Sequence, residues 1–404
     1  MLAAVVVSQL SAQKTSKTEI LSSIESGCDY MQKTMLDKEG KSRCDYNMMQ
    51  SAWEPYEVAW HTGQAINALL DGYLITNNKK YLNKAIQAGN WWISLEIKDH
   101  PKLNGMIKST HGAEMGETIV YSTTTDGSAG LFKLWRVTGN KKYAQVATNA
   151  GKWLYENNFE PVSGLSYDCI DPVTGEVQKN WSLFWPDRKI QSLNDVARPN
   201  AEGSLFLDMS RFTGDEKFKQ WFINQCDVMV RTQSENGLWM CFTPNDTTNM
   251  SIHPRFNLWY AEALMDGYEI TGDKKYLEAA LKTARYHQQM QQKNGTIYYR
   301  NYADGKNPDI ESVTGSAVSF SGILWLRLLK AGAGKEFEKS IEKSIQWVLL
   351  NRFSVSHPDP NLRGAFIDSR LKDRKTGIWM VNRDIGTIFG VRFLSDYYNY
   401  YYKK

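Results

Sequence analysis

The chain has 404 residues, of which 42% are hydrophobic and 23% charged, and its formal net charge is +4. Acidic and basic residues are interspersed, which argues against a nucleic-acid partner. No apolar run reaches the roughly 18 residues of a membrane span, and no Gly/Pro/Ser-rich linker divides the chain, so we expect a single domain over 14–404.

Residues 1–13 have the pattern of a secretory signal remnant. An apolar stretch leads to a small-residue site near Leu10-Ser-Ala-Gln13, which is typical of a signal-peptide cleavage region. The basic segment that usually opens such a signal is missing, and a frayed apolar start is the alternative. The pattern predicts a periplasmic or secreted protein.

A short turn motif recurs every 58 to 75 residues and predicts the fold. Within each copy a Gly or Asn can end one helix in the left-handed conformation, and the next Asn or Asp can cap a second helix. Each copy is therefore expected to form a tight corner between two helices, as in repeat architectures. The copies are Thr76-Asn-Asn-Lys-Lys-Tyr81, Thr138-Gly-Asn-Lys-Lys-Tyr143, Thr213-Gly-Asp-Glu-Lys-Phe218, Thr271-Gly-Asp-Lys-Lys-Tyr276 and the degenerate Ala331–Phe337.

Apolar helices precede these corners and amphipathic helices follow them. Helices that are apolar nearly all round are buried, and they are predicted at 57–75, 127–137, 200–212, 257–270, 314–330 and 384–400. One-sided helices belong on the outside, and they are predicted at 18–37, 79–95, 141–157, 216–232, 274–290 and 335–351.

Alternating inner and outer helices predict an all-α fold, an (α/α)6 barrel of six helical hairpins. A straight solenoid is the alternative, but a solenoid needs a polar terminal repeat, and the last predicted helix is apolar.

The connections from outer to inner helices are long, and all of them lie at the end of the barrel where the inner helices begin. They span 38–56, 96–126, 158–199, 233–256, 291–313 and 352–383. Long loops in a compact domain usually carry function, and converging helix N-termini favour an anion. We expect the functional site here, together with short strands at 164–169 and 296–300.

Charged residues at the starts of the inner helices are the candidate catalytic groups. Asp126 is expected to open the second inner helix, as an N-cap, as a catalytic carboxylate, or as both. Glu202 lies within a nearly uncharged helix, where a carboxylate is costly unless it is paired or used. Arg198 can pair with Glu202 or bind a substrate carboxylate. His61, in the first inner helix, is the third catalytic candidate.

Aromatic and polar side chains near the same end are the candidate substrate-binding groups. Tryptophan rings suit sugar stacking because pyranose faces are apolar and their edges are polar. The predicted binding residues are Trp60, Trp185, Arg198, Asn200, His253, Arg255, Trp259, Tyr260 and Arg383.

Cofactor and metal motifs are missing from the sequence. There is no P-loop, dinucleotide glycine fingerprint, Gly-x-Ser-x-Gly elbow or His-Glu-x-x-His in a suitable context. Five cysteines form no CxxC pair, which disfavours a zinc site and a disulfide framework. We therefore expect no cofactor and no metal; a single Cys28–Cys44 bridge is compatible with an oxidising compartment.

The sequence resembles the six-hairpin glycosidase group, and within it the unsaturated glucuronyl and rhamnogalacturonyl hydrolases. The resemblance covers most of the chain and is carried by the corners, the Trp-rich starts of inner helices and Thr314-Gly-Ser-Ala-Val-Ser-Phe320. Uronate lyases and sugar epimerases share such corners. In the hydrolases an Asp at the start of each of two successive inner helices carries the reaction. Asp126 matches the first, whereas the second position offers Arg198, Asn200 and Glu202 instead of Asp.

The resemblance implies an enzyme that hydrolyses a terminal 4,5-unsaturated uronyl residue of an anionic oligosaccharide. Asp126 and Glu202 would be the acid/base pair, and Arg198 the carboxylate clamp. Three alternatives stay open: a polysaccharide lyase with a His or Tyr base, a sugar epimerase, and a non-catalytic carbohydrate-binding protein. The lyase candidates are His61, His253, Tyr260 and Asn257.

Overall fold

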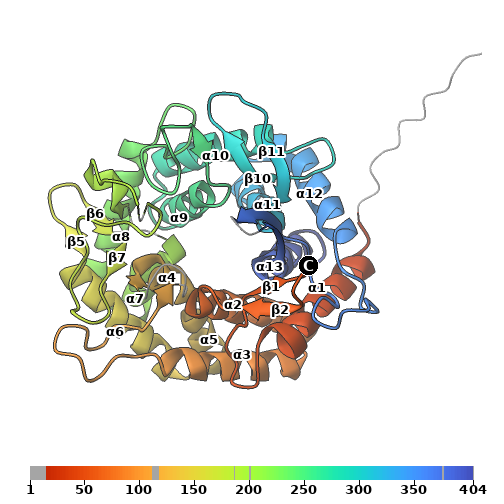
Figure 1. The fold of residues 1–404 in the computed structure, drawn as a ribbon, viewed down its shortest axis with the longest axis horizontal. Coiled ribbons are helices and arrows are strands. Elements are labelled where there is room, and N and C mark those ends of the chain that lie inside the picture. Colours follow the sequence, from red (N-terminus) through yellow and green to blue (C-terminus); the bar gives the residue numbers. More distant parts are fainter. Residues whose placement is uncertain (1–14, 112–117, 186, 200–201, 375–376, 404) are drawn as a thin grey trace, which may run out of the picture.

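A computed structural model describes residues 15–403 except 112–117, 186, 200–201 and 375–376, so the predicted signal remnant lies outside the described residues. The helices form two concentric layers (Figure 1). The inner layer holds α2 (Val58–Thr76), α4 (Tyr121–Gly127), α5 (Ala129–Thr138), α7 (Leu205–Thr213), α9 (Phe256–Thr271), α11 (Gly315–Lys330) and α13 (Ile385–Tyr401). The outer layer holds α1 (Lys17–Tyr30), α3 (Lys79–Ile93), α6 (Lys141–Asn157), α8 (Glu216–Thr232), α10 (Lys274–Met290) and α12 (Glu338–Leu350).

The inner helices close into a ring. The last of them, α13, packs against α11 and also against α2, the first. Arg392 on α13 donates a hydrogen bond to Gln64 on α2 over 3.2 Å. The prediction of a closed (α/α)6 barrel is thus confirmed, and the solenoid alternative is wrong.

The repeated corners have the predicted conformation. Asn77, Gly139, Gly214 and Gly272 are left-handed, with φ of 55°, 74°, 74° and 71°. The residue after each one caps the following helix by accepting a backbone N–H two residues further on; these residues are Asn78, Asn140, Asp215 and Asp273. Residues 331–337 form a looser corner that ends in a 3-10 turn, Lys335–Phe337.

Two inner helices begin elsewhere than predicted. The second starts at Tyr121 and is interrupted at Ser128, so Asp126 lies near the end of α4 and is not an N-cap. The third starts only at Leu205, because Gly203 and Ser204 are left-handed, with φ of 68° and 55°, and end a 3-10 turn there. In the outer layer, α1 continues into a π-helix, Met31–Met35.

Strands occupy the long connections. One sheet has the order β2-β1-β13-β12-β11-β10-β9 and two smaller sheets have the orders β3-β4-β7 and β5-β6-β8, all with antiparallel pairing. The predicted strands at 164–169 and 296–300 overlap observed strands. The bounds are β1 Asp45–Asn47, β2 Ala52–Glu54, β3 Thr110–His111, β4 Thr118–Val120, β5 Phe159–Glu160, β6 Leu165–Tyr167, β7 Cys169–Ile170, β8 Ala197–Arg198, β9 Ser251–Ile252, β10 Tyr298–Tyr302, β11 Asp309–Val313, β12 Ser369–Arg374 and β13 Gly377–Asn382.

All five cysteines are free thiols, so Cys28 and Cys44, whose pairing the sequence left open, form no disulfide. Cys28 on α1 instead fills the contact with α2, where a Cβ on Gly72 would lie only 2.3 Å from its Sγ. Within the described residues, no helix combines the length and apolarity that a membrane crossing requires.

A close backbone contact between α2 and α4 sets the position of the residues on both helices. A Cβ on Gly63 would lie 2.0 Å from the carbonyl oxygen of Gly127. Because backbone atoms cannot move aside without shifting a helix, we expect Gly63→Ala to lower the free energy of unfolding by about 3 kcal/mol.

The matched control for this variant is Gly139→Ala, at a corner glycine with φ of 74° and no neighbouring atom within 4 Å of an added Cβ. It should cost only about 1 kcal/mol, from the left-handed conformation alone. Urea unfolding of both variants measures the difference, and equal losses would contradict the close-contact argument.

Candidate active site

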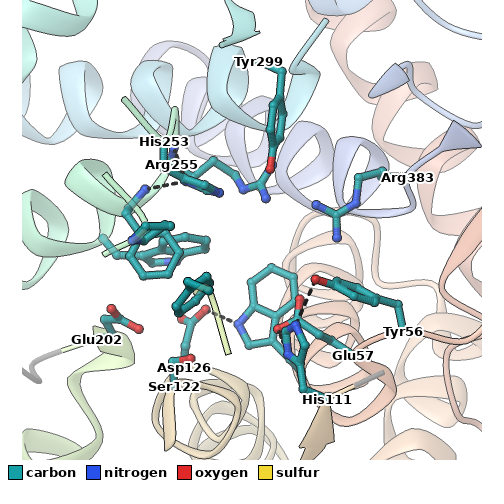
Figure 2. A pocket seen from close by; sticks show the side chains of 15 residues that line it. Tyr56, Glu57, His111, Ser122, Asp126, Glu202, His253, Arg255, Tyr299 and Arg383 are labelled. Carbon is teal, nitrogen blue, oxygen red and sulfur yellow. Dashed lines mark hydrogen bonds and ion pairs between the residues drawn. The ribbon is translucent and has the colours of Figure 1, made fainter. Parts of the chain in front are cut away.

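A cavity of about 180 Å³ opens at the end of the barrel where the inner helices begin. Figure 2 shows its side chains, which come from the starts of inner helices and from the strands and loops above them. Its lining residues are Tyr56, Glu57, Trp60, His111, Ser122, Asp126, Phe184, Glu202, Pro244, His253, Arg255, Phe256, Trp259, Tyr299 and Arg383.

Asp126 lies on the floor of this cavity. The Nε1–H of Trp60 donates to its Oδ2 over 2.6 Å, and the contact between α2 and α4 places the two side chains together. Burial, and then the nearby Glu202 carboxyl, raise the pKa of Asp126 to about 8. At neutral pH this carboxyl therefore holds a proton that it can donate.

Glu202 lies beside Asp126 because the chain turns at Gly203. A Cβ on Gly203 would lie 2.5 Å from the Cα of Asp126, so only a glycine permits this approach. Burial raises the pKa of Glu202 to about 7, although the Arg198 guanidinium opposes the shift. The two carboxyls thus form an acidic wall of the cavity.

Arg198 is fully buried behind this wall and is not a cavity-lining residue. Its Nε donates to Asp168 over 2.7 Å, and its Nη1 lies 3.8 Å from Glu202. Aromatic rings enclose the guanidinium, with the Phe256 ring centroid 4.3 Å away. Arg198 therefore does not face the cavity as the predicted carboxylate clamp would, and its ion pairs are with Asp168 and, at longer distance, with Glu202, the predicted alternative.

Two other arginines face the cavity opposite the acidic wall. Arg255 and Arg383 point their guanidinium groups into it, and Tyr299 lies between them (Figure 2). Arg255 donates to Ser316 over 3.1 Å, and Arg383 donates to Asp45 over 2.8 Å, which fixes both orientations. This wall can bind an anion.

Tyr56, Glu57 and His111 form a third group of side chains, beside the first residues of α2. Glu57 Oε1 is 2.7 Å from His111 Nδ1, and His111 Nε2 is 2.9 Å from the Tyr56 hydroxyl. Burial alone would raise the pKa of Glu57, but His111 outweighs it and the pKa falls to about 2. Glu57 is therefore ionised at every physiological pH.

His253 has a defined tautomer. Its Nδ1 accepts the backbone N–H groups of Arg255 and Phe256, at 3.2 and 3.3 Å, at the start of α9. A neutral imidazole that accepts at Nδ1 carries its proton on Nε2. His253 can therefore act as a hydrogen-bond donor in the cavity.

His61 lies beneath the cavity and is fully buried, which removes it from direct contact with a ligand. Its Nδ1 pairs with Asp384, whose other oxygen accepts from Ser42 over 2.6 Å. Burial disfavours the imidazolium, but Asp384 raises the pKa of His61 above its usual value. The donor atoms of Asp45, His61 and Asp384 lie within 4.8 Å of one another and could hold a cation, yet Asp45 is already paired with Arg383.

The other predicted residues are divided between the cavity and its surroundings. Trp60, Glu202, Asp126, His253, Arg255, Trp259 and Arg383 line the cavity. Trp185 and Tyr260 do not: Trp185 stacks on Arg188, with 4.9 Å from the guanidinium to its ring, and Tyr260 packs on Trp239. Asn200 lies outside the described residues. Asn257 is buried, and its side-chain oxygen accepts the backbone N–H of Trp239.

Sequence reasoning missed Tyr56, Glu57, His111 and Tyr299. Tyr56 and Glu57 directly precede α2, and the expectation that charged groups gather at helix starts could have found them. His111 and Tyr299 come from strands β3 and β10, and no sequence pattern marks which residue of a long connection reaches the cavity.

A second, larger cavity of about 490 Å³ lies on the other side of Asp126 and Trp259, which line both spaces. Its charged side chains are largely paired with one another, as in Lys133–Asp71, Arg392–Glu262 and Arg327–Asp266. Asp126 and Trp259 therefore separate the cavity at the helix starts from a polar barrel interior.

No family model and no curated protein matches this sequence. Solved structures match over nearly the whole chain. Cellobiose 2-epimerase from Bacillus thermoamylovorans B4167 superposes with a TM-score of 0.71 at 14% identity, covering 94% of this chain and 99% of the epimerase. Unsaturated glucuronyl hydrolase from Bacillus sp. GL1 gives 0.66 at 11% identity, covering 93% and 96%, and D-mannose isomerase gives 0.65 at 13%, covering 94% and 97%.

At these identities the matches show the fold, not the activity. They confirm the predicted resemblance to the six-hairpin glycosidase group at the level of the (α/α)6 barrel. Hydrolases, epimerases and isomerases all occur among the similar structures.

Proposed function

We propose that the protein is a carbohydrate-active enzyme that hydrolyses the terminal 4,5-unsaturated uronyl residue of an oligosaccharide. The main support is the position of Asp126, a carboxyl with a pKa of about 8, which faces two arginines across one cavity. The arginine wall would bind the uronyl carboxylate, and Trp60 and Trp259 offer apolar faces to the sugar ring.

In this reaction Asp126 gives its proton to C4 of the double bond, and water adds at C5. Glu202 lies beside Asp126 and raises its pKa, so it keeps the donor protonated. The fold neighbours named as unsaturated glucuronyl hydrolases add support for this substrate class.

The direct test is the absorbance of the double bond. Oligosaccharides produced by lyases from glycosaminoglycan, pectin and ulvan are incubated with the protein. Loss of absorbance is the expected result, and unchanged absorbance across all three substrate classes would remove the proposal. A gain of absorbance on the intact polysaccharides would identify a lyase instead.

Sugar epimerisation or isomerisation is the second candidate. Two imidazoles, His111 and His253, lie on opposite sides of the cavity (Figure 2), an arrangement suited to removing a proton from a sugar carbon and returning it. The matches to cellobiose 2-epimerase and D-mannose isomerase add support for epimerisation or isomerisation. Chromatography of cellobiose and mannose after incubation with the protein distinguishes this activity from hydrolysis.

Arg255 offers a test of the carboxylate site. We expect Arg255→Met to raise KM for an unsaturated uronyl disaccharide about 10- to 100-fold, the value of a charge-assisted hydrogen bond. The methyl ester of the same disaccharide carries no charge, so its KM should be high for the wild type and change little in the variant. If acid and ester respond equally, Arg255 does not recognise the carboxylate.

A further inference from the structure

The side chains of Glu57, His111 and Tyr56 have no role in the proposed reaction as described so far, in which Asp126 donates the proton and Glu202 raises its pKa. The three side chains come from the start of α2 and the end of β3, and all three line the cavity. They lie near Arg383 and away from Glu202 (Figure 2). Glu57 makes an ion-pair contact of 2.7 Å with His111 Nδ1, and His111 Nε2 shares a hydrogen bond of 2.9 Å with the Tyr56 hydroxyl. The three groups thus lie in the order carboxylate, imidazole, hydroxyl.

The order of these groups favours one direction of proton movement, from Tyr56 to His111. Glu57, 2.7 Å from Nδ1, favours the His111 tautomer that carries its proton on Nδ1, and this tautomer offers Nε2 as an acceptor for the Tyr56 hydroxyl. The same order of carboxylate, imidazole and hydroxyl activates the nucleophile in hydrolytic triads. Tyr56 can thus pass its proton to His111 when its oxygen takes another proton from a ligand.

The positive charge of Arg383 near Tyr56 favours this proton transfer to His111. The Arg383 guanidinium carbon lies 5.8 Å from the centroid of the Tyr56 ring, so negative charge that develops on the phenol oxygen is stabilised. An imidazolium formed at His111 is stabilised by Glu57 in the same way.

Asp126 and Glu202 are placed as the proton-donating side of the cavity. Burial raises the pKa of Asp126 to about 8 and that of Glu202 to about 7, so both carboxyls hold protons at mildly acidic pH. Glu57, by contrast, has its pKa lowered to about 2 beside His111 and is ionised in this range as well.

We propose that Tyr56, backed by His111 and Glu57, is the general base that takes a proton from the water attacking C5 of the unsaturated uronyl ring. Tyr56 is then a catalytic residue, and His111 and Glu57 are positioning residues that act through it. This inference rests on the proposed hydrolysis, and it replaces Glu202 as the base.

The step balances without a co-reactant. The π electrons of C4=C5 form a C4–H bond with the proton of Asp126, and the water oxygen bonds to C5. The water proton goes to the Tyr56 oxygen while the Tyr56 proton moves to His111 Nε2. The hydrated ring then opens and releases its glycosidic partner; solvent removes the proton from His111 and restores that of Asp126.

Tyr56→Phe tests the base. It keeps the ring beside Arg383 and removes the oxygen, so kcat should fall about 100-fold or more, as expected on losing a general base, with KM within about twofold. His111→Gln should lower kcat to a similar extent. The matched control is Tyr302→Phe on β10, whose hydroxyl donates to Asp309 away from the cavity, and it should keep wild-type kcat. A Tyr56→Phe variant with wild-type kcat would overturn the inference.

Nitrogen NMR of the imidazoles tests this arrangement without any substrate. Wild-type protein should show neutral His111 protonated at Nδ1, with Nε2 as acceptor, and Tyr56→Phe should shift the Nε2 signal but leave the other histidines unchanged. Neutral His111 protonated at Nε2 would overturn the inference even in an active hydrolase. If the wild type does not act on unsaturated uronyl sugars, the proposed function fails. The NMR result still decides which nitrogen of His111 carries the proton.

Discussion

Replacing Asp126 with asparagine is expected to lower kcat on unsaturated uronyl oligosaccharides about 100-fold or more, the usual contribution of a general acid. Asparagine has the same shape, and its amide oxygen can still accept the Trp60 Nε1–H that Asp126 accepts over 2.6 Å. The variant loses only the proton that the carboxyl donates. Initial rates from the decay of the double-bond absorbance measure the effect, and circular dichroism confirms the fold.

The same substitution should change how stability depends on pH. The pKa of Asp126 is about 8 in the folded protein and 3.8 in the reference state, so this carboxyl binds more proton in the folded state between these values, and its contribution to stability falls as the pH rises from 4 to 8. The asparagine side chain of the variant cannot titrate. Asp126→Asn should therefore gain stability relative to wild type by at most about 1.4 kcal/mol per pH unit.

Urea unfolding of both proteins at pH 5 and pH 8 measures this change. A stability difference that does not grow toward pH 8 would show that Asp126 is ionised in the fold. In that case it could not be the proton donor, whatever its effect on kcat.

The fold could be predicted because its signals are local. Each corner needs one residue with positive φ and one capping side chain, and both requirements can be seen in a stretch such as Thr138–Tyr143. The helix boundaries failed where a tertiary contact overrode the local pattern. Gly203 turns the chain against the backbone of Asp126, and this contact delays the third inner helix to Leu205.

The site could be predicted only in part, for the same reason. Residues at helix starts, such as Trp60, Arg255 and Arg383, reach the cavity because the barrel brings those ends together. Residues in the long connections depend on strand register and loop packing, which no local pattern encodes. His111 was therefore missed, and Arg198 was assigned to the substrate although β8 turns it into the protein.

Arg198→Met is expected to destabilise the protein by about 3–5 kcal/mol, the usual cost of removing one partner of a buried ion pair. Asp168 is fully buried and loses the Nε–H donor that it accepts over 2.7 Å. Burial already raises the pKa of Asp168, and Arg198 opposes that shift. Without the guanidinium the carboxyl must either stay charged in an apolar environment or take up a proton.

The double variant Arg198→Met/Asp168→Asn distinguishes a structural role of Arg198 from a role in substrate binding. It removes both charges of the 2.7 Å pair, so we expect it to recover most of the lost stability, as replacing a whole buried pair usually costs little. Because Arg198 does not line the cavity and lies against the Phe256 ring, which does, KM for the uronyl substrate should change less than in Arg255→Met. The opposite outcome is a double variant that stays as unstable as the single one while KM rises 10-fold or more, an effect the size of a lost charge-assisted hydrogen bond. In that case Arg198 binds the substrate, and its assignment as a buried structural ion-pair partner is wrong.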